Sequence, residues 1–299
     1  MLRPIVVGLD GSRESVAAAD WAAREALRRG LRLRVVHAWE GLPPDEEPVT
    51  LPELRVPRYW ARRILRGTVD RLGERYPQLS LDPEQIRRPP VPALLAEAES
   101  ADTLVLGNQG FGGLGGLLAG SVAMAVVAHA RTPVVLVRAG FGATDEHVPN
   151  GDGEASARTS HRPVVVALDP GHSCDSLLAF AFETARHRSA LLHAVHAWRP
   201  PHARAAGTGD PRHAATRRDA EWVLESLLEP WQDKYPQVAV HMSVEHGRPA
   251  PVLLRAARSA GLLVLGHEVR HSKLAAHMGH VAHMAIRQVG CPVAVVAHE

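Results

Sequence analysis

The sequence predicts an α/β protein built from two tandem domains, each with a five-stranded parallel sheet. Three observations predict this class. The chain aligns with itself at one constant shift, strand-like runs alternate with helical patterns in each copy, and a glycine-rich loop joins a strand to a helix. We expect the first domain at residues 1–138, a linker at 139–161 and the second domain at 162–299.

The internal repeat has a shift of 159 positions, which moves Arg3 onto Arg162. A period of this length indicates two whole domains rather than a solenoid of small units. The further matches need no gap: Leu9-Asp10 falls on Leu168-Asp169, His37-Ala38-Trp39 on His196-Ala197-Trp198, Tyr76-Pro77-Gln78 on Tyr235-Pro236-Gln237, Leu104-Val105-Leu106-Gly107 on Leu263-Val264-Leu265-Gly266, and Pro133-Val134 on Pro292-Val293.

In the first copy, short apolar runs predict buried strands, and longer runs with apolar residues on one face predict helices. Ser12 is the expected N-cap of the first helix, and Gly120-Ser121 the expected cap of the last. The predicted strands cover residues 4–9, 31–39, 78–87, 103–107 and 133–138, and the predicted helices 12–29, 59–75, 92–100 and 122–130.

Composition excludes several classes of function. The net charge is only +2 and the basic residues are spread along the chain, so we expect no nucleic-acid partner. No apolar run reaches the roughly 18 residues of a membrane span, and no signal peptide is apparent, so we expect a cytoplasmic protein with no membrane partner. Cys174 and Cys291 lie in different copies without metal-ligand spacing, which fits a reducing compartment.

The glycine-rich loop is the main candidate for a ligand site. Residues 107–121 read GNQGFGGLGGLLAGS, between a buried strand and a helix. Glycine lets the backbone come close to a ligand, and a helix N-terminus offers unpaired N–H groups with a partial positive charge. The pattern therefore predicts an anion site, with a loop that merely turns the chain as the alternative.

Two general phosphate motifs fit this loop poorly. A P-loop needs a lysine, but the only lysines are Lys234 and Lys273. The dinucleotide pattern GxGxxG is present at Gly110, Gly112 and Gly115, yet the acidic residue expected about 20 positions later is missing. The pattern G-xx-G-x9-G-S, formed by Gly107, Gly110 and Gly120-Ser121, resembles the nucleotide loop of the ATP-binding universal stress protein (UspA) family.

Other segments share this resemblance: VVGLDGS at 6–12, VVHAW at 35–39, LVLGNQG at 104–110 and TPVVLV at 132–137. Together they make the chain look like a tandem member of the family. The resemblance implies an adenine-nucleotide-binding, Rossmann-like fold with ATP at the carboxyl ends of the strands. It also implies dimers formed through the last strand, either as a homodimer or by pairing of the two domains of one chain.

Carried over residue by residue, the resemblance implies that Asp10 lies near the adenosine part, where a carboxylate can accept a hydrogen bond from a ribose hydroxyl. A turn or cap residue is the alternative for Asp10. Asn108 and Gln109 depart from the family pattern because neutral amides replace a small or basic residue. ATP is the implied cofactor, with Mg²⁺ as an open addition, and the implied binding residues are Gly8, Leu9, Asp10, Ser12, Ala38, Gly107, Gly110, Gly120, Ser121 and Val122.

The second copy has lost most of this loop. At the same shift, Val269 replaces Gly110, and His280 replaces Ser121, although Asp169 remains. A β-branched side chain disfavours both positive φ and close approach of phosphates. We therefore predict one ATP site, in the first copy, and a second copy that is structural or recognises something else.

Histidines are concentrated in the second copy, where 15 of 18 lie at or beyond His161. Spacing by three between 277 and 283 could bring two imidazoles to one ion, but no carboxylate or thiol completes a site, so we predict no metal. A pH-responsive surface and simply solvated side chains are the alternatives. The cluster comprises His267, His271, His277, His280 and His283.

The sequence predicts a regulatory or stress-response protein that holds ATP as a ligand, and not an enzyme. Asp10, Ser12 and His37 might suggest a hydrolase triad, but GLDGS does not match GxSxG. Two alternatives stay open: slow ATP hydrolysis or autophosphorylation by the first copy, and an interaction module without nucleotide that uses the edge strands 133–137 and 292–296.

Overall fold

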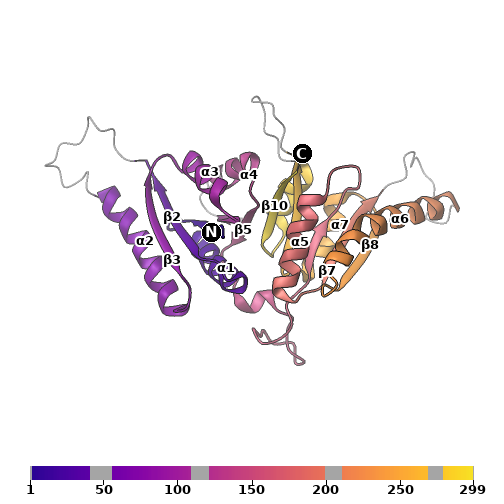
Figure 1. The fold of residues 1–299 in the computed structure, drawn as a ribbon, viewed down its shortest axis with the longest axis horizontal. Helices are drawn as coiled ribbons and strands as arrows, with labels where there is room; N and C mark the ends of the chain where they lie inside the picture. Colours follow the sequence, from indigo (N-terminus) through magenta and orange to yellow (C-terminus); the bar gives the residue numbers. More distant parts are fainter. Residues whose placement is uncertain (1, 41–55, 109–120, 199–210, 269–278, 299) are drawn as a thin grey trace. The chain divides into compact units, whose positions relative to one another are not determined.

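A computed structural model describes residues 2–40, 56–108, 121–198, 211–268 and 279–298, without the side chains of 56–61 and 211–216 (Figure 1). It divides the chain into two compact units, Met1–Gly142 and Ala143–Glu299. This boundary lies inside the segment that we expected to be a linker. Gly110, Gly120, Val269, His271 and His277 lie outside the described residues.

The first unit contains a five-stranded parallel sheet in the order β3-β2-β1-β4-β5. At its centre, Val7 of β1 pairs with Val35 of β2 on one side and with Val105 of β4 on the other. All three valines are fully buried, as expected for a sheet covered on both faces. The strands are β1 Ile5–Gly8, β2 Leu33–Trp39, β3 Leu81–Arg87, β4 Thr103–Asn108 and β5 Val134–Arg138.

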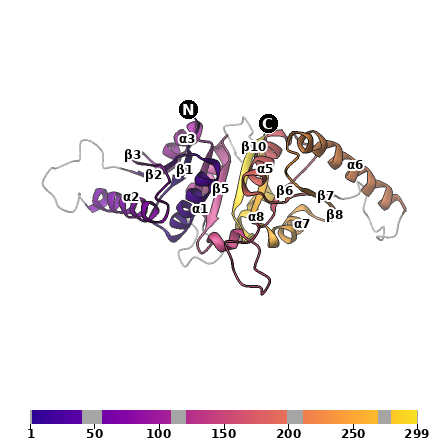
Figure 2. The ribbon, with the colours of Figure 1, turned by 60° about the horizontal axis from the view of Figure 1, so that its bottom comes forward.

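Helices cover both faces of this sheet. Helices α1 and α2 contact each other and lie on one face, whereas α3 and α4 contact each other on the opposite face (Figure 2). All four residues of β1 are buried. The helices are α1 Arg13–Arg29, α2 Val56–Arg75, α3 Pro90–Ser100 and α4 Ser121–His129.

Helix α1 has clear local signals at both ends. The Ser12 hydroxyl accepts the Ser15 N–H at 3.1 Å, which confirms the predicted N-cap. At the other end Gly30 adopts a left-handed φ of 64°, the conformation that favours glycine at a helix C-terminus. Helix α4 begins at Ser121, one residue before the predicted start, and Gly120 of the expected cap lies outside the described residues.

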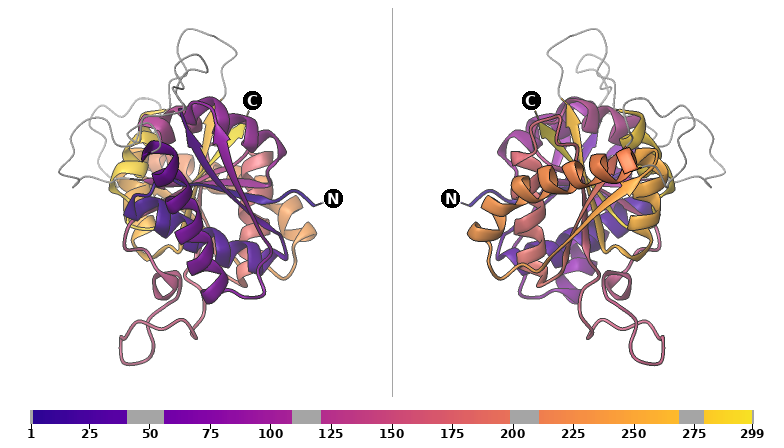
Figure 3. Two further views of the ribbon diagram at one scale, coloured as in Figure 1. Left: turned by 90° about the vertical axis from the view of Figure 1, so that its left-hand side faces the viewer. Right: turned by 90° about the vertical axis from the view of Figure 1, so that its right-hand side faces the viewer.

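The second unit repeats this architecture with the strand order β8-β7-β6-β9-β10, all parallel. Helices α5 and α6 contact one another on one face, and α7 and α8 on the other (Figure 2). Helix α6, orange in the right-hand view of Figure 3, packs against β7 and β8. The elements are β6 Val164–Ala167, α5 Asp175–Arg188, β7 Leu192–Trp198, α6 Pro211–Lys234, β8 Val240–His246, α7 Pro249–Ala256, β9 Leu262–Glu268, α8 His280–Gln288 and β10 Val293–His298.

Helix α5 starts later in the repeat than α1. Its first residue, Asp175, corresponds to position 16 of the first copy, whereas α1 already begins at Arg13. The capping serine has been replaced by Gly171, and the residue at the N-cap, Cys174, makes no side-chain cap hydrogen bond. Without the hydroxyl to satisfy the first amides, the helix begins three residues further on.

The polar segment before the second unit is held by backbone hydrogen bonds. The Arg162 N–H donates to the carbonyl of Glu146 at 2.8 Å, and the Val148 N–H to that of Ser160 at 2.9 Å. Glu146 is fully buried. These bonds connect residues 143–161 to the second unit. The composition of the segment, which contains few apolar side chains, does not predict them.

Arg34 of the first unit is replaced by His193 in the second, and the two side chains have different partners. Arg34 of β2 donates hydrogen bonds to the carboxylates of Glu97 at 2.6 Å and Asp82 at 2.9 Å. The bond to Glu97, supported by Asp82, raises the pKa of Arg34 above its usual range, although partial burial acts in the opposite direction. In β7, the same place holds His193, which lies beside His241 with ring centroids 4.8 Å apart. Burial lowers the pKa of His193, and a charge on His241 lowers it further.

In each unit the strand order changes direction next to the first strand, between β1 and β4 and between β6 and β9. In open α/β sheets, ligands bind beyond the carboxyl ends of the strands at this switch point. Among the described residues, no helix is both long and apolar enough to span a membrane.

Candidate functional site

A pocket with a volume of 210 Å³ opens at the carboxyl ends of β1 and β4 in the first unit. It lies at the switch point of the strand order, where the sequence analysis expected the nucleotide. Two predicted binding residues, Gly110 and Gly120, lie outside the described residues. The other eight all line this pocket: Gly8, Leu9, Asp10, Ser12, Ala38, Gly107, Ser121 and Val122.

Apolar side chains form one part of the pocket lining, which we call the apolar slot. Leu94 of α3 and Leu106 of β4 are at least 95% buried and form one wall, and Val36 and Ala38 of β2 contribute to the lining. An apolar lining of this kind suits an aromatic ring, because contact with it removes apolar surface from water.

Asp10 lies at the end of β1, where it holds the turn into α1. Its Oδ1 accepts the Ser12 N–H at 2.9 Å and also accepts the Ser12 hydroxyl. Burial raises the pKa of Asp10, but these hydrogen bonds outweigh it and hold the pKa below the usual value. Asp10 is therefore an ionised acceptor at neutral pH that both shapes the turn and borders the pocket.

The opposite end of the pocket is formed by backbone. Gly107 packs against the start of α1, since a Cβ on it would lie 2.6 Å from the Ser15 nitrogen. Ser121, at the first position of α4, is exposed. The charged residues among the described lining are Asp10 and Glu14, with no lysine or arginine. Within the described residues, the donors for an anion are therefore backbone N–H groups and hydroxyls.

The hydrolase alternative finds no support in the geometry. The Nδ1 atom of buried His37 lies 2.8 Å from the carbonyl oxygen of Leu9, and the Ser12 hydroxyl is bonded to Asp10 instead. A nucleophile and its base must share a hydrogen bond, but the Ser12 hydroxyl is bonded to Asp10 and the His37 ring to Leu9. His37 therefore acts as a core residue that ties β2 to the end of β1.

The histidine cluster of the second copy is only partly described. His267 is 5% exposed in β9, whereas His280 and His283 lie on α8. Within the described ranges, no group of three or more histidine, cysteine or acidic side chains could hold a metal ion. Cys174 and Cys291 are buried and neither is in a disulfide.

Several lining residues were not predicted from the sequence. Leu94 lies in the predicted helix 92–100, Leu106 in the predicted strand 103–107, and Glu14 and Ser15 in the predicted helix 12–29, without a predicted role in binding. The only available signal was their position next to predicted strand ends. Periodicity shows that a residue is buried, but it does not show which cavity the residue borders.

The profile described as the universal stress protein family matches residues 1–138 and 160–297, which cover most of the chain. The chain belongs to the universal stress protein family. The two matched segments correspond to the two repeats found in the sequence, so it is a tandem member of this family.

Curated universal stress proteins resemble the chain over almost its full length. One from Mycobacterium tuberculosis (strain ATCC 25618 / H37Rv) is 31% identical over 301 residues, covering 97% of this chain and 96% of that protein. One from Mycolicibacterium smegmatis is 31% identical over 305 residues, covering 98% and 96%. The match thus spans almost the whole of this chain and of both relatives.

Solved structures show the same fold. The crystal structure of a universal stress protein from Archaeoglobus fulgidus DSM 4304 matches with a TM-score of 0.65 and 16% identity, covering 99% of this chain and 98% of that chain. At this identity the likeness concerns the fold alone. It agrees with the predicted α/β class and with two tandem five-stranded parallel sheets.

Proposed function

We propose that the first unit of this universal stress protein binds ATP, as a ligand that reports nucleotide state rather than as a substrate. The observation that carries the proposal is the convergence of eight predicted residues on one pocket at the switch point of the sheet. Adenine would occupy the slot between Leu94 and Ala38. Asp10 would face the ribose hydroxyls.

The phosphates would then lie toward the start of α4 and the glycine-rich sequence that precedes it. Ser121 supplies a hydroxyl there, and the first turn of α4 supplies backbone N–H groups with the positive end of the helix dipole. Asp10 and Glu14 are both acidic, so a bound triphosphate needs either these backbone donors or an accompanying cation such as Mg²⁺.

A regulatory role follows from the chemistry of the pocket. Among the described lining residues, the Ser12 hydroxyl is bonded to Asp10, which is a weak base because its pKa is lowered, and no arginine or lysine is placed to stabilise a transferring phosphoryl group. Slow hydrolysis or autophosphorylation is the second candidate. Accumulation of ADP or phosphoprotein within minutes under excess Mg²⁺ would favour it.

The test is the nucleotide content of protein purified without added ATP, measured by acid release and chromatography. Ala38→Phe fills the slot of the first unit, and Ala197→Phe is the matched change in the second. We expect about one ATP per chain in the unmodified protein and in Ala197→Phe, and little in Ala38→Phe.

Equal ATP in both variants would contradict a site in the first unit. No ATP in the unmodified protein, together with no binding at micromolar concentration in solution, would favour the interaction module without nucleotide. The dimer expected through the last strands, β5 and β10, stays a prediction, and sedimentation of the intact protein tests it.

A further inference from the structure

Strand β8 forms one edge of the sheet in the second unit, where its neighbour is β7. Among the described residues, no strand lies on the other side of β8, which we call its free edge. Such an edge presents a row of N–H and C=O groups, which proteins usually protect with proline, charged side chains or a covering segment. Strand β3 is the equivalent edge of the first unit, so the two edges can be compared residue by residue.

The hydrogen bonds between β7 and β8 show which residues of β8 direct their backbone groups outward. At one end the Leu192 N–H donates to the Ala239 carbonyl at 2.9 Å, and at the other the Gly247 N–H donates to the Trp198 carbonyl at 3.1 Å. Because the backbone groups of alternate residues point to the same side of a strand, the odd-numbered residues of β8 face β7. The residues that direct their N–H and C=O groups to the free edge therefore include Val240, Met242 and Val244.

The equivalent edge of the first unit carries two protecting residues. The Ser80 carbonyl accepts a hydrogen bond from β2 at 2.9 Å, which sets the same alternation in β3, so Pro83 faces outward. Proline has no N–H to offer at an edge. At the shift of 159, Pro83 becomes Met242 and the neighbouring Glu84 becomes Ser243. Strand β8 has therefore lost both the proline and the charge that protect β3.

A second copy of the chain fits the free edge when two β8 strands pair in antiparallel orientation about Ser243. Met242 of one copy then lies opposite Val244 of the other, and these outward-facing residues can exchange N–H and C=O hydrogen bonds. On the other face of the sheet, His241 lies opposite Glu245 of the second copy, which sets an imidazole rather than a like charge against the carboxylate. The free edge is therefore self-complementary.

The same arrangement is unfavourable for β3. Pairing about Glu84 sets this carboxylate opposite the same carboxylate of the second copy, and Pro83 removes one donor from each strand. Arg34 offsets only part of the repulsion, because Asp82, Glu84 and Glu97 share this one guanidinium. Self-association through an edge strand is thus a property of the second unit and not of the repeat.

Helix α6 packs on one face of β8 and contributes both attraction and repulsion. Trp231 stacks on Phe182 of α5 with ring centroids 6.0 Å apart, so the opposite side of α6 is turned toward the free edge. That side carries Trp222, which is 68% exposed, together with Glu225 and Glu229. Trp222 offers apolar surface to a second copy, whereas the glutamates of two copies repel one another unless salt screens them.

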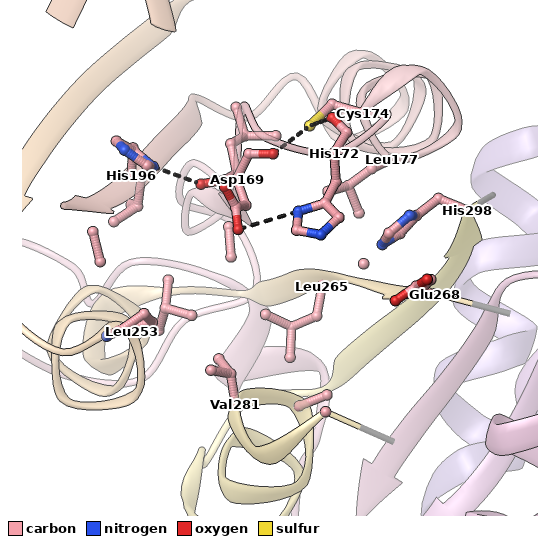
Figure 4. A pocket seen from close by; sticks show the side chains of 18 of the residues that line it. Asp169, His172, Cys174, Leu177, His196, Leu253, Leu265, Glu268, Val281 and His298 are labelled. Carbon is pink, nitrogen blue, oxygen red and sulfur yellow. Dashed lines mark hydrogen bonds and ion pairs between the residues drawn. The ribbon is translucent and has the colours of Figure 1, made fainter. Parts of the chain in front are cut away.

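The free edge is separate from the pocket of the second unit. This pocket has a volume of 340 Å³ and opens at the carboxyl ends of β6 and β9, where Figure 4 shows the His172 imidazole between Asp169 and His298. None of its described lining residues belongs to β8. Pairing through β8 therefore leaves the described pocket lining uncovered by β8.

We propose that two copies of this chain associate through β8, in an antiparallel strand pair centred on Ser243 that joins the sheets of their second units. The pair has two-fold symmetry, with the same surface contributed by both copies. It differs from the association expected through β5 and β10. The inference goes beyond the proposed function and does not require that either unit bind a nucleotide.

Disulfide cross-linking of the full-length protein tests the register. In the proposed pair, the Cα atoms of the two Ser243 residues lie about 4.5 Å apart, within the range that a disulfide spans. Ser243→Cys should therefore give a covalent dimer under mild oxidation. Two copies of His241→Cys place their Cα atoms more than about 13 Å apart and should give little. The unmodified protein is the background control, because its two cysteines are buried. No dimer from Ser243→Cys, or equal dimer from both variants, would overturn the inference.

Sedimentation velocity over a range of protein concentrations, at high ionic strength, tests the affinity. Met242→Pro restores the proline of β3 at a residue whose N–H faces outward, so it should raise the dissociation constant of the dimer at least about tenfold. Pro83→Ala is the matched change in the first unit and should leave the constant unchanged. Urea unfolding of Met242→Pro checks that its second unit is folded. An unmodified protein that stays monomeric, or a dimer that Met242→Pro does not weaken, would contradict pairing through β8.

Discussion

The sharpest prediction concerns two equivalent glycines at the ends of β4 and β9. A Cβ on Gly107 would lie 2.6 Å from the backbone nitrogen of Ser15 and 2.7 Å from the carbonyl carbon of Glu14. These atoms belong to the start of α1 and cannot rotate away. Gly107→Ala therefore pushes the strand and the helix apart, which is a form of overpacking that costs about 1–3 kcal/mol.

The matched change is much milder. A Cβ on Gly266 would meet the ring of His298, 2.8 Å from Cδ2 and 3.0 Å from Nε2. A side chain can turn to relieve this contact, at a cost of about 0.5–1.5 kcal/mol for an off-rotamer position. Both variants exchange glycine for alanine, so their effects on the unfolded chain are alike and cancel in the comparison.

Urea unfolding at 25 °C, with ATP titration of the same samples, measures both consequences. We expect Gly107→Ala to lower the free energy of unfolding by more than Gly266→Ala does. It should also weaken ATP binding, because a shift of the start of α1 also shifts the turn that contains Asp10. In a unit of this size the loss corresponds to roughly 3–10 °C in melting temperature. A neutral Gly107→Ala, or a larger loss for Gly266→Ala, would refute the steric argument.

Three further predictions concern local interactions. Arg34→Gln should lower the free energy of unfolding, measured in urea, by about 1–2 kcal/mol after allowance for solvent screening, because it leaves Glu97 next to other carboxylates without a cation. No loss would show that these ion pairs do not contribute to stability. His193 has a lowered pKa, so the unfolded chain binds more protons than the folded one below about pH 6.5 and stability falls on acidification. His193→Gln should make the urea midpoint depend less on pH between 7.5 and 5.5. An unchanged pH dependence would show that His193 does not cause the loss of stability. Ser12→Ala should cost about 1 kcal/mol of stability by removing the cap of α1, whereas the exposed Ser100→Ala serves as a control with little effect.

The sequence alone was enough for the repeat, the fold class and most elements. These features depend on local or periodic signals: the capping hydroxyl of Ser12, the glycine at position 30, and short β-branched runs between helical patterns. The parallel sheet then follows from the alternation of strands and helices, because parallel neighbours require a crossover connection. The start of α4 at Ser121 rather than Val122 is the kind of boundary that such signals leave open.

Only the tertiary structure decided what borders each pocket. In the first pocket, Leu94 and Ser15 come from two helices with no fixed spacing in sequence, and they meet at the strand ends because a parallel sheet brings its carboxyl ends to one edge. In the second pocket, His298 comes from the last strand in the same way. The sequence did not predict the second pocket for the same reason. Its altered loop indicated that a phosphate site had been lost, and the apolar residues that line the pocket follow the pattern of ordinary core positions. Periodicity determines which side chains are buried, but the cavity that they line is a property of how helices and strands from distant parts of the chain pack together.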